Sequence, residues 1–424
     1  MFMLPLMATS ILMQSYVIAD GLILGNFIDE EALGSVNSVS SIIDICTLVQ
    51  IAIAGGCSIS ASHLFGAGKY SELKRMIGDF YKIILAVSIG ITILAVIGAN
   101  RILELINTPS LLMDGASTYL KIVFLGVPFS SLYALQSGVL RGMGDSKRPL
   151  GGIAISSCVN IGLDLLFIVG FDMNIEGAAI ATLASEVLSA IYLHVKLKNR
   201  AGQLIDDTDK PQSRVAECIE LGFPQIIQSM ATSLGRVLLQ NITNILGASV
   251  VIGVTAAFKV DGILVIPLMC MSQATSVFTG QNIGANKPQR VTETLKLSVI
   301  LSLIFSAFLT FALWMWGQQM LGWFGIGIKS GEVGYRYIML CLPFYWLFGL
   351  QFVFNGYLNG SKHTLQASIA SIIALAARVL VAYMGFRSVG SDVLPVSEAV
   401  SWAVGVVIDI GFIIFFRKKY RKKL

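Results

Sequence analysis

Acidic and polar side chains stand inside long apolar runs of this sequence, at spacings that place them on shared helix faces. Asn160 and Asp164 are four residues apart, as are Thr182 and Glu186, so each pair shares one face of a helical segment. Asp20 stands in another apolar run near the start of the chain. Carboxylate, amide and hydroxyl oxygens suit a hard cation, and two neighbouring carboxylates can instead share a proton. The pattern predicts a site that binds sodium or protons.

The runs that carry these residues are too apolar for a soluble protein. Of the 424 residues, 55% are hydrophobic and only 13% are charged, whereas about a quarter are charged in ordinary soluble domains. A helix needs about 20 mostly apolar residues to cross a bilayer. The sequence therefore predicts an all-α integral membrane protein with twelve transmembrane helices, near residues 3–24, 34–58, 77–99, 116–139, 150–170, 177–195, 219–244, 249–275, 294–316, 334–356, 366–386 and 395–416.

The positions of Lys and Arg predict the orientation in the membrane. Of the 30 basic residues, 21 fall in the two termini and the loops on their side, against 4 in the opposite loops. Positively charged loops stay in the cytoplasm, so we expect a multi-pass protein of the plasma membrane, which is the inner membrane where there are two, with both termini cytoplasmic. The net charge of +5 comes from these loops rather than from a basic domain, so no nucleic-acid partner is expected.

An internal repeat divides the chain into two halves. Short segments recur at a nearly constant offset, which is 218 for Gly66 with Gly284 (284 − 66) and Gly142 with Gly360, and 219 for Gly34 with Gly253 and Pro5 with Pro224. Each half holds an even number of spans, so the halves have the same orientation and are related by a pseudo-two-fold axis along the membrane normal. We expect an N-lobe of six helices at 1–200, a cytoplasmic linker at 201–216, and a C-lobe of six helices with a basic tail at 217–424.

Several motifs together resemble the multidrug and toxic compound extrusion (MATE) transporters. They are LPL and ADGLILG in the first span, EEALGSVN, GGCSISASHLFGAGK, LRGMGDSKRP, NIGLDLLFIVG, EGAAIATLASE, VTAAFKVDGILVIP and TGQNIGANK. The resemblance covers essentially the whole chain and implies a two-lobed secondary antiporter that exports organic compounds in exchange for protons or sodium. It also implies, for the branch with an acidic N-lobe cation site, that the coupling residues are Asp20, Asn160, Asp164 and Thr182.

Other polar residues in the spans have both a functional and a structural interpretation. Glu186 and Asp44 either take part in coupling or bond to neighbouring helices. Pro5 either permits a gating bend of the first helix or only marks its first turn.

The second half lacks the acidic pair that one branch of the family has there. Its charged residues inside the spans include Arg236, Asp261 and Arg378. They form either a neutralised ion-pair network or a contact for an anionic or zwitterionic substrate.

These observations predict a secondary antiporter that exports amphipathic small molecules or drugs by alternating access, and not an enzyme. The alternative is a flippase for a lipid-linked saccharide or another lipid. No cofactor is expected besides the coupling ion, and no metal beyond possible sodium at the four coupling residues. The expected partners are small-molecule substrates and the lipid bilayer, and the protein is expected to be a monomer.

Overall fold

The computed structural model describes residues 2–205 and 211–421, and these fold as helices with no strand among them. The middle of the predicted linker, 206–210, and the end of the predicted basic tail, 422–424, lie outside the described residues. The chain divides into two compact units, Met1–Gly222 and Phe223–Leu424. The all-α class predicted from the sequence is confirmed.

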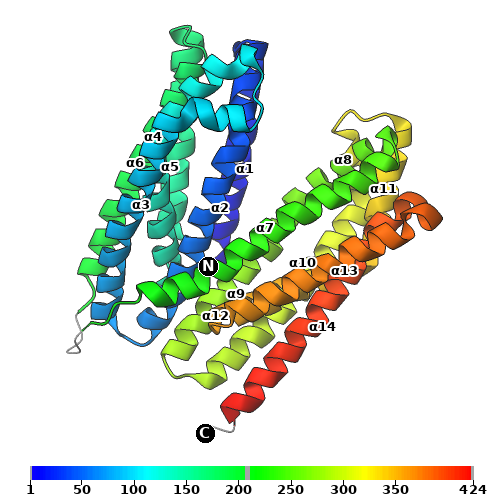
Figure 1. Ribbon diagram of the computed structural model, residues 1–424. Helices are drawn as coiled ribbons and strands as arrows, with labels where there is room; N and C mark the ends of the chain where they lie inside the picture. The colour runs from blue at the N-terminus through cyan, green and yellow to red at the C-terminus, as the bar shows by residue number, and fades with distance from the viewer. Residues whose placement is uncertain (1, 206–210, 422–424) are drawn as a thin grey trace. The chain divides into compact units, whose positions relative to one another are not determined.

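Unit 1, Met1–Gly222, is a bundle of long helices that run side by side (Figure 1). Its helices are α1 (Met3–Phe27), α2 (Glu30–Gly66), α3 (Tyr70–Leu105), the short η1 (Ser110–Leu112), α4 (Met113–Gly142), α5 (Lys147–Asp164), a π-helical turn η2 (Leu165–Gly170) and α6 (Ile175–Gly202). Helix α4 packs along α2, α3 and α6, and α5 packs against both α1 and α6. Side chains of α5 therefore lie between those of α1 and α6.

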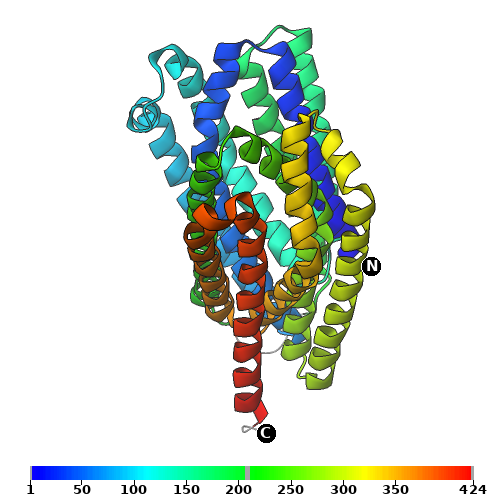
Figure 2. The same cartoon turned by 90° about the vertical axis from the view of Figure 1, so that its right-hand side faces the viewer.

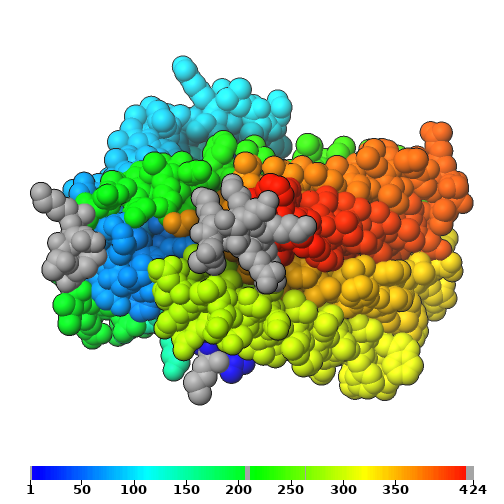
Figure 3. All heavy atoms as spheres, turned by 90° about the horizontal axis from the view of Figure 1, so that it is seen from below, coloured from blue at the N-terminus to red at the C-terminus, as the bar shows by residue number. Residues whose placement is uncertain are grey.

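Unit 2, Phe223–Leu424, contains most of α7 (Val215–Ile245), which begins within unit 1. It continues with α8 (Ala248–Leu264), α9 (Ile266–Gly284), α10 (Pro288–Gly322), α11 (Ile328–Cys341), η3 (Leu342–Phe344), α12 (Tyr345–Gly360), α13 (Thr364–Val389), η4 (Gly390–Asp392) and α14 (Val393–Arg421). Helix α14 runs as one long rod toward the C-terminus (Figure 2). Helices α13 and α14 pack on each other and lie side by side when seen from below (Figure 3).

Nine helical segments of the described residues are long and apolar enough to cross a membrane, and the bent pair of α8 and α9 would be a tenth. One of the nine, Thr364–Phe416, contains both α13 and α14, and α7 is not among them. The twelve predicted crossings correspond to α1 to α7, the α8 and α9 pair, α10, the α11 and α12 pair, α13 and α14.

The ends of the helices repeat at the offset that the sequence predicts. Helix α2 ends at Gly66 and α9 at Gly284, while α4 ends at Gly142 and α12 at Gly360, which are both differences of 218. The first residues of α3 and α10, Tyr70 and Pro288, differ by the same amount. The two halves of the chain thus repeat as a series of helices and not only as loop motifs.

A close contact between helices repeats as well. In unit 1, a Cβ atom on Gly138 would lie 2.5 Å from the carbonyl oxygen of Ala54 on α2. In unit 2, a Cβ atom on Gly356 would overlap the carbonyl oxygen of Ser272 on α9. Gly356 follows Gly138 by 218 positions (356 − 138), and Ser272 follows Ala54 by the same number (272 − 54). Glycine is required at these positions because the helix backbones touch.

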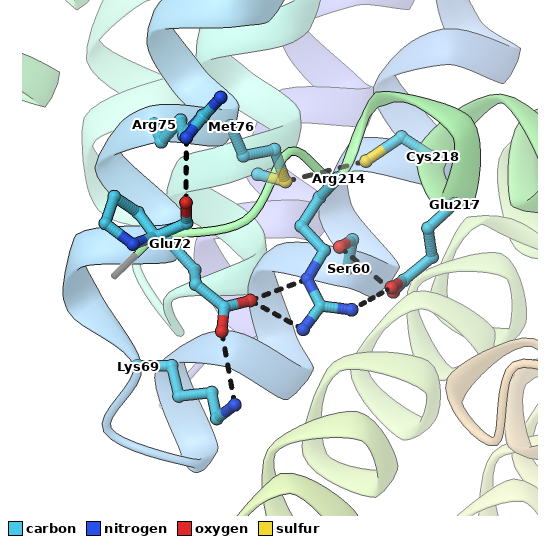
Figure 4. Close-up of polar contacts among 9 residues, drawn as sticks. Ser60, Lys69, Glu72, Arg75, Met76, Arg214, Glu217 and Cys218 are labelled. Carbon is cyan, nitrogen blue, oxygen red and sulfur yellow. Dashed lines mark hydrogen bonds and ion pairs between the residues drawn. The ribbon is translucent and has the colours of Figure 1, made fainter. Parts of the chain in front are cut away.

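The start of α7 is held to α2 and α3 by a group of charged side chains and one serine hydroxyl (Figure 4). The Arg214 guanidinium donates to Glu72 at 2.6 Å and to Glu217 at 2.9 Å. Lys69 donates to Glu72 at 3.1 Å, and Ser60 donates to Glu217 at 3.2 Å. The first turns of α7 therefore pack as part of unit 1, and the division between the units falls inside this helix, after Gly222.

Candidate functional site

Three helices of unit 1 carry the predicted coupling residues. Asp20 lies on α1, Asn160 and Asp164 on α5, and Thr182 on α6. Because α5 packs against both other helices, it presents one residue toward each neighbour. The structure thus brings together the four residues that the sequence indicates.

The contacts between these residues form two pairs. The carboxyl groups of Asp20 and Asp164 lie within hydrogen-bonding reach of each other. The Asn160 amide donates to the Thr182 hydroxyl at 3.5 Å, and that hydroxyl donates to the carbonyl oxygen of Ala178 at 3.0 Å. Asn160 and Asp164 are both 0% exposed, so bulk water does not solvate them.

The site has more oxygen acceptors than hydrogen-bond donors. Among the described residues, neither carboxylate oxygen of Asp164 has a hydrogen-bond partner, nor does the side-chain oxygen of Asn160. Ionised carboxylates only accept hydrogen bonds, and leaving a buried acceptor unpaired costs free energy. A proton shared between Asp20 and Asp164 would supply the missing donor. A cation bound by the same oxygens would satisfy them equally.

Helix α5 changes its winding directly after Asp164. Residues Leu165–Gly170 form a π-helical turn, in which the Phe171 amide donates to the Leu166 carbonyl oxygen at 2.9 Å. Such turns widen a helix locally and occur frequently at functional sites. Nothing in the apolar sequence of this turn distinguishes it from ordinary α-helix.

Two tyrosines beside the carboxylates are not indicated by the sequence pattern. Tyr16 of α1 and Tyr119 of α4 both lie close enough to Asp20, Asp164 and Glu186 to interact with their charges. The spacing of Tyr16 and Asp20 by four residues is a signal that could have found the first. Tyr119 carries no local signal, because its position depends on how α4 packs.

Glu186 lies on α6 and packs against α4. Its Oε2 atom would overlap a Cβ atom placed on Gly126, so the absence of a side chain at Gly126 makes room for the carboxylate. The same oxygen is buried and has no hydrogen-bond partner among the described residues. Glu186 is therefore a third acceptor-rich group near the aspartate pair.

The remaining predicted residues of unit 1 lie apart from these contacts. Pro5 is in the first turn of α1, where its carbonyl oxygen accepts from the Thr9 hydroxyl at 2.8 Å. A proline in the first turn leaves the helix intact, because its missing N–H has no partner within the helix there. Asp44 is exposed on α2. A gating bend at Pro5 remains a prediction.

The charged residues predicted in unit 2 have separate partners. Arg378 of α13 forms an ion pair with Glu398 of α14. Asp261 of α8 accepts a hydrogen bond from the hydroxyl of Tyr345 at 2.7 Å. Arg236 is exposed on α7. The ion pair of Arg378 agrees with the alternative of a neutralised ion-pair network. Contact of these residues with a charged substrate remains a prediction.

No group of three or more His, Cys, Asp or Glu side chains is placed to hold a metal ion within the part of the chain that the structure describes. A cation at the aspartate pair would depend on amide and hydroxyl oxygens as well as on carboxylates. This donor set suits a hard monovalent ion and not a transition metal.

Comparison with known proteins shows what this chain resembles. A family model described as MatE matches residues 5–166 and 224–384, which together are more than half of the chain. The chain is 28% identical over 376 residues to the probable multidrug resistance protein YpnP of Bacillus subtilis (strain 168), which is 88% of this chain and 84% of that relative. It is 24% identical over 432 residues to the probable multidrug resistance protein YoeA of the same organism, which is 99% of this chain and 93% of that relative.

A solved structure has the same fold. It is described as the outward-facing conformation of a multidrug resistance MATE family transporter of the MOP superfamily. It matches with a TM-score of 0.89 and 18% sequence identity, over 100% of this chain and 96% of that chain. The predicted fold of twelve helices in two lobes is confirmed.

Proposed function

This chain belongs to the MatE family, and on that basis we propose that it exports amphipathic small molecules in exchange for sodium ions or protons. It is a multi-pass membrane protein whose relatives are transporters and not enzymes. Two relatives are named as multidrug resistance proteins, which supports small organic compounds as the exported class.

The observation that supports the ion coupling is the pairing of Asp20, which is half-buried, with Asp164, which is buried and has no hydrogen-bond donor among the described residues. Asp20 and Asp164 face each other, and the oxygens of Asp164 lack partners among the described residues. Two carboxylates at such close range cannot both remain charged and unpaired in a low-dielectric site. Uptake of a proton or a sodium ion therefore accompanies their approach.

The proposed mechanism is reciprocal occupancy by alternating access. An external cation or proton binds Asp20 and Asp164, and the substrate is released to the outside. Return to the inward-open state then releases the ion to the cytoplasm, after which new substrate binds. The ion gradient drives export because the ion and the substrate favour different states of the carrier. A bend of α1 near Pro5 is the proposed gate.

Transport in proteoliposomes tests the site. Asp20→Asn and Asp164→Asn should each lose gradient-driven export while remaining monodisperse and retaining drug binding. The double variant should be little worse than either single one, because residues that act as a unit give non-additive losses. Asp114→Asn is the matched control, since Asp114 is an exposed aspartate in the first turn of α4. Near wild-type export by either single variant would disprove the site.

The choice of gradient separates the two coupling ions. One set of liposomes carries a sodium gradient at equal pH, and another carries a pH gradient without sodium. Only one of these two gradients should drive export. Export without either gradient would disprove ion coupling altogether. The lipid flippase alternative finds no support in the relatives described above.

Location and assembly extend the proposal. We propose that the protein resides in the plasma membrane with both termini in the cytoplasm and that it functions as a monomer. Its ligands are then the exported molecule and the coupling ion, with no other cofactor.

A further inference from the structure

The repeat assigns a counterpart in unit 2 to Asp20, Asp164 and Asn160 of the coupling site and to the neighbouring Tyr119. The counterparts are Leu239 for Asp20, at the offset of 219 that relates Pro5 to Pro224, and, at the offset of 218, Ala382 for Asp164, Arg378 for Asn160 and Tyr337 for Tyr119. Both aspartates are thus replaced by apolar residues. The buried amide is replaced by a guanidinium group, and the tyrosine is kept.

The guanidinium group has its own carboxylate in unit 2. Arg378 of α13 forms an ion pair with Glu398 of α14, and the two side chains are only 18% and 12% exposed. The Tyr337 hydroxyl donates to the same carboxylate at 3.1 Å. Asp261 lies near enough to interact electrostatically with both Glu398 and Tyr337.

The helices that meet in this cluster match those that meet at the N-lobe site. Arg378 stands on α13, the counterpart of α5, and Glu398 stands on α14, the counterpart of α6, which carries Thr182. Tyr337 stands on α11, which corresponds to the first half of α4. Glu398 is not itself the counterpart of an N-lobe acid, so the negative charge comes from a different position on the equivalent helix.

The physical difference between the two clusters lies in their cation. In unit 1 the carboxylate oxygens of Asp164 lack hydrogen-bond donors among the described residues, and under the proposed function they take up a proton or an ion from solution. In unit 2 the cation is a guanidinium group that is covalently part of the chain. Helix α13 also continues without interruption to Val389, whereas α5 gives way to a π-helical turn after Asp164.

We propose that Arg378 is a tethered cation, which occupies in the C-lobe the place that the coupling ion takes in the N-lobe. The proposal rests on the proposed function for what the N-lobe site binds. It assigns ion responsiveness to the N-lobe alone and gives Arg378 the task of holding α11, α13 and α14 together permanently. Removal of its guanidinium leaves a carboxylate site, built by Glu398 with Tyr337 and Asp261 nearby, that accepts a small soluble cation.

Chemical rescue of the full-length purified protein tests this assignment. Arg378→Ala should lower the thermal unfolding midpoint by several degrees, because it leaves the Glu398 carboxylate buried and unpaired. Millimolar guanidinium or methylguanidinium chloride should restore a large part of the loss, while the same concentration of urea or choline chloride should not. The wild-type protein and Arg378→Lys should show no such response.

A double variant and a matched control keep the test decisive. Arg378→Ala with Glu398→Gln removes both charges, so it should be more stable than Arg378→Ala alone and should not respond to guanidinium. Arg387→Ala is the control, since Arg387 lies on the same helix and stacks on the Phe386 ring. If Arg378→Ala cannot be purified, the double variant should still purify.

Two outcomes would overturn the assignment. One is an Arg378→Ala protein that is indifferent to guanidinium, and the other is a double variant no more stable than Arg378→Ala. Neither readout involves transport or the N-lobe aspartates. A failure here is therefore distinguishable from a failure of the coupling site, which is read from export by Asp20→Asn and Asp164→Asn.

Discussion

At the scale of single residues, the Glu186 carboxylate occupies the space that a side chain at position 126 would need, so Gly126 must remain small. A Cβ atom on Gly126 would overlap the Glu186 carboxylate. Gly126→Ala should therefore destabilise the protein by about 1–3 kcal/mol, the usual cost of overpacking. The double variant Gly126→Ala with Glu186→Ala should recover part of this loss, because the obstructing group is gone. A double-mutant cycle from thermal unfolding measures the coupling, and strictly additive effects would contradict the contact.

A second residue-scale prediction concerns a turn that the two halves share. Gly68 follows α2 with a positive φ of 71°, and its counterpart Asn286 follows α9 with a φ of 54°. Nothing lies within 4 Å of a Cβ atom placed on Gly68, so only backbone strain opposes a side chain. Gly68→Ala should cost about 1–2 kcal/mol.

Asparagine tolerates this left-handed conformation better than alanine. Gly68→Asn should therefore be clearly less destabilising than Gly68→Ala, as the native Asn286 suggests. Thermal unfolding of the two variants in the same detergent compares them directly. Equal losses would indicate that an effect other than backbone conformation dominates at this turn.

The residues of the candidate site differ in how well the sequence predicts them. Asn160 and Asp164 are identifiable because polar groups are costly inside apolar runs and their spacing places them on one helix face. Tyr119, and Glu398 in unit 2, cannot be identified from the sequence, since their roles arise only from the packing of separate helices. The ion pair of Arg378 with Glu398 joins residues 20 positions apart on two helices (398 − 378), and no helical spacing relates them.

At the scale of helices, hydropathy predicts the part of each helix that crosses the membrane but not the polar turns that extend the helix beyond it. The predicted span at 34–58 belongs to α2, which runs for 37 residues from Glu30 to Gly66. A bilayer needs only about 20 residues, so the polar ends of such a helix carry no hydropathy signal. The π-helical turn at Leu165–Gly170 is missed for another reason, because its composition is that of any apolar helix.

The start of α7 supplies a prediction at this scale. Glu72 is only 3% exposed and accepts from Arg214 at 2.6 Å. Partial burial lowers the pKa of Arg214, but the hydrogen bond to Glu72 and the charges of Glu217 and Glu72 outweigh it, so the pKa is raised. When the pKa of a basic group is raised in the folded protein, its contribution to stability is lost only as the pH rises through that raised pKa. Arg214 therefore stays charged throughout the physiological range.

Glu72→Gln should therefore destabilise the protein by about 1.5–3 kcal/mol, the range for hydrogen bonds to charged groups. Trypsin should cleave faster after Arg214, because opening of the first turn of α7 becomes easier. Lys69→Gln is the control, since Lys69 is 42% exposed and its loss leaves the contact between Glu72 and Arg214 intact. Equal cleavage of the two variants would mean that this network does not hold the start of α7.

At the scale of the whole molecule, the repeat is the feature that the sequence predicts best. A few glycines in the loops give its offset, and the ends of corresponding helices in the two halves differ by the same number of residues. The division between the units is harder to predict, because it falls inside α7 rather than in the polar linker. A composition change marks the linker, whereas the attachment of the start of α7 to unit 1 depends on contacts distant in sequence.

The orientation in the membrane is the prediction that joins all of these elements. The basic residues predict that the termini are cytoplasmic. With that orientation, the turns that follow α4 and α9 are expected in the cytoplasm and those that follow α3 and α10 outside. Single cysteines at Glu104 and Lys329 should react with an impermeant maleimide on intact cells. Cysteines at Lys147 and Lys287 should react only after permeabilisation. All four native side chains are exposed in the structure, so lack of reaction would report the membrane and not burial.

The native thiols must be removed first for this labelling to be readable. Of the six cysteines, Cys158 is exposed and Cys46 is half-buried, while the other four are buried. Cys158→Ser with Cys46→Ser should therefore give a silent background. Because an even number of crossings separates Lys147 from Lys287, these two sites must always label alike, whichever way the protein is inserted. Labelling of Lys147 from outside would reverse the orientation, whereas different labelling of Lys147 and Lys287 would refute the parallel arrangement of the two halves.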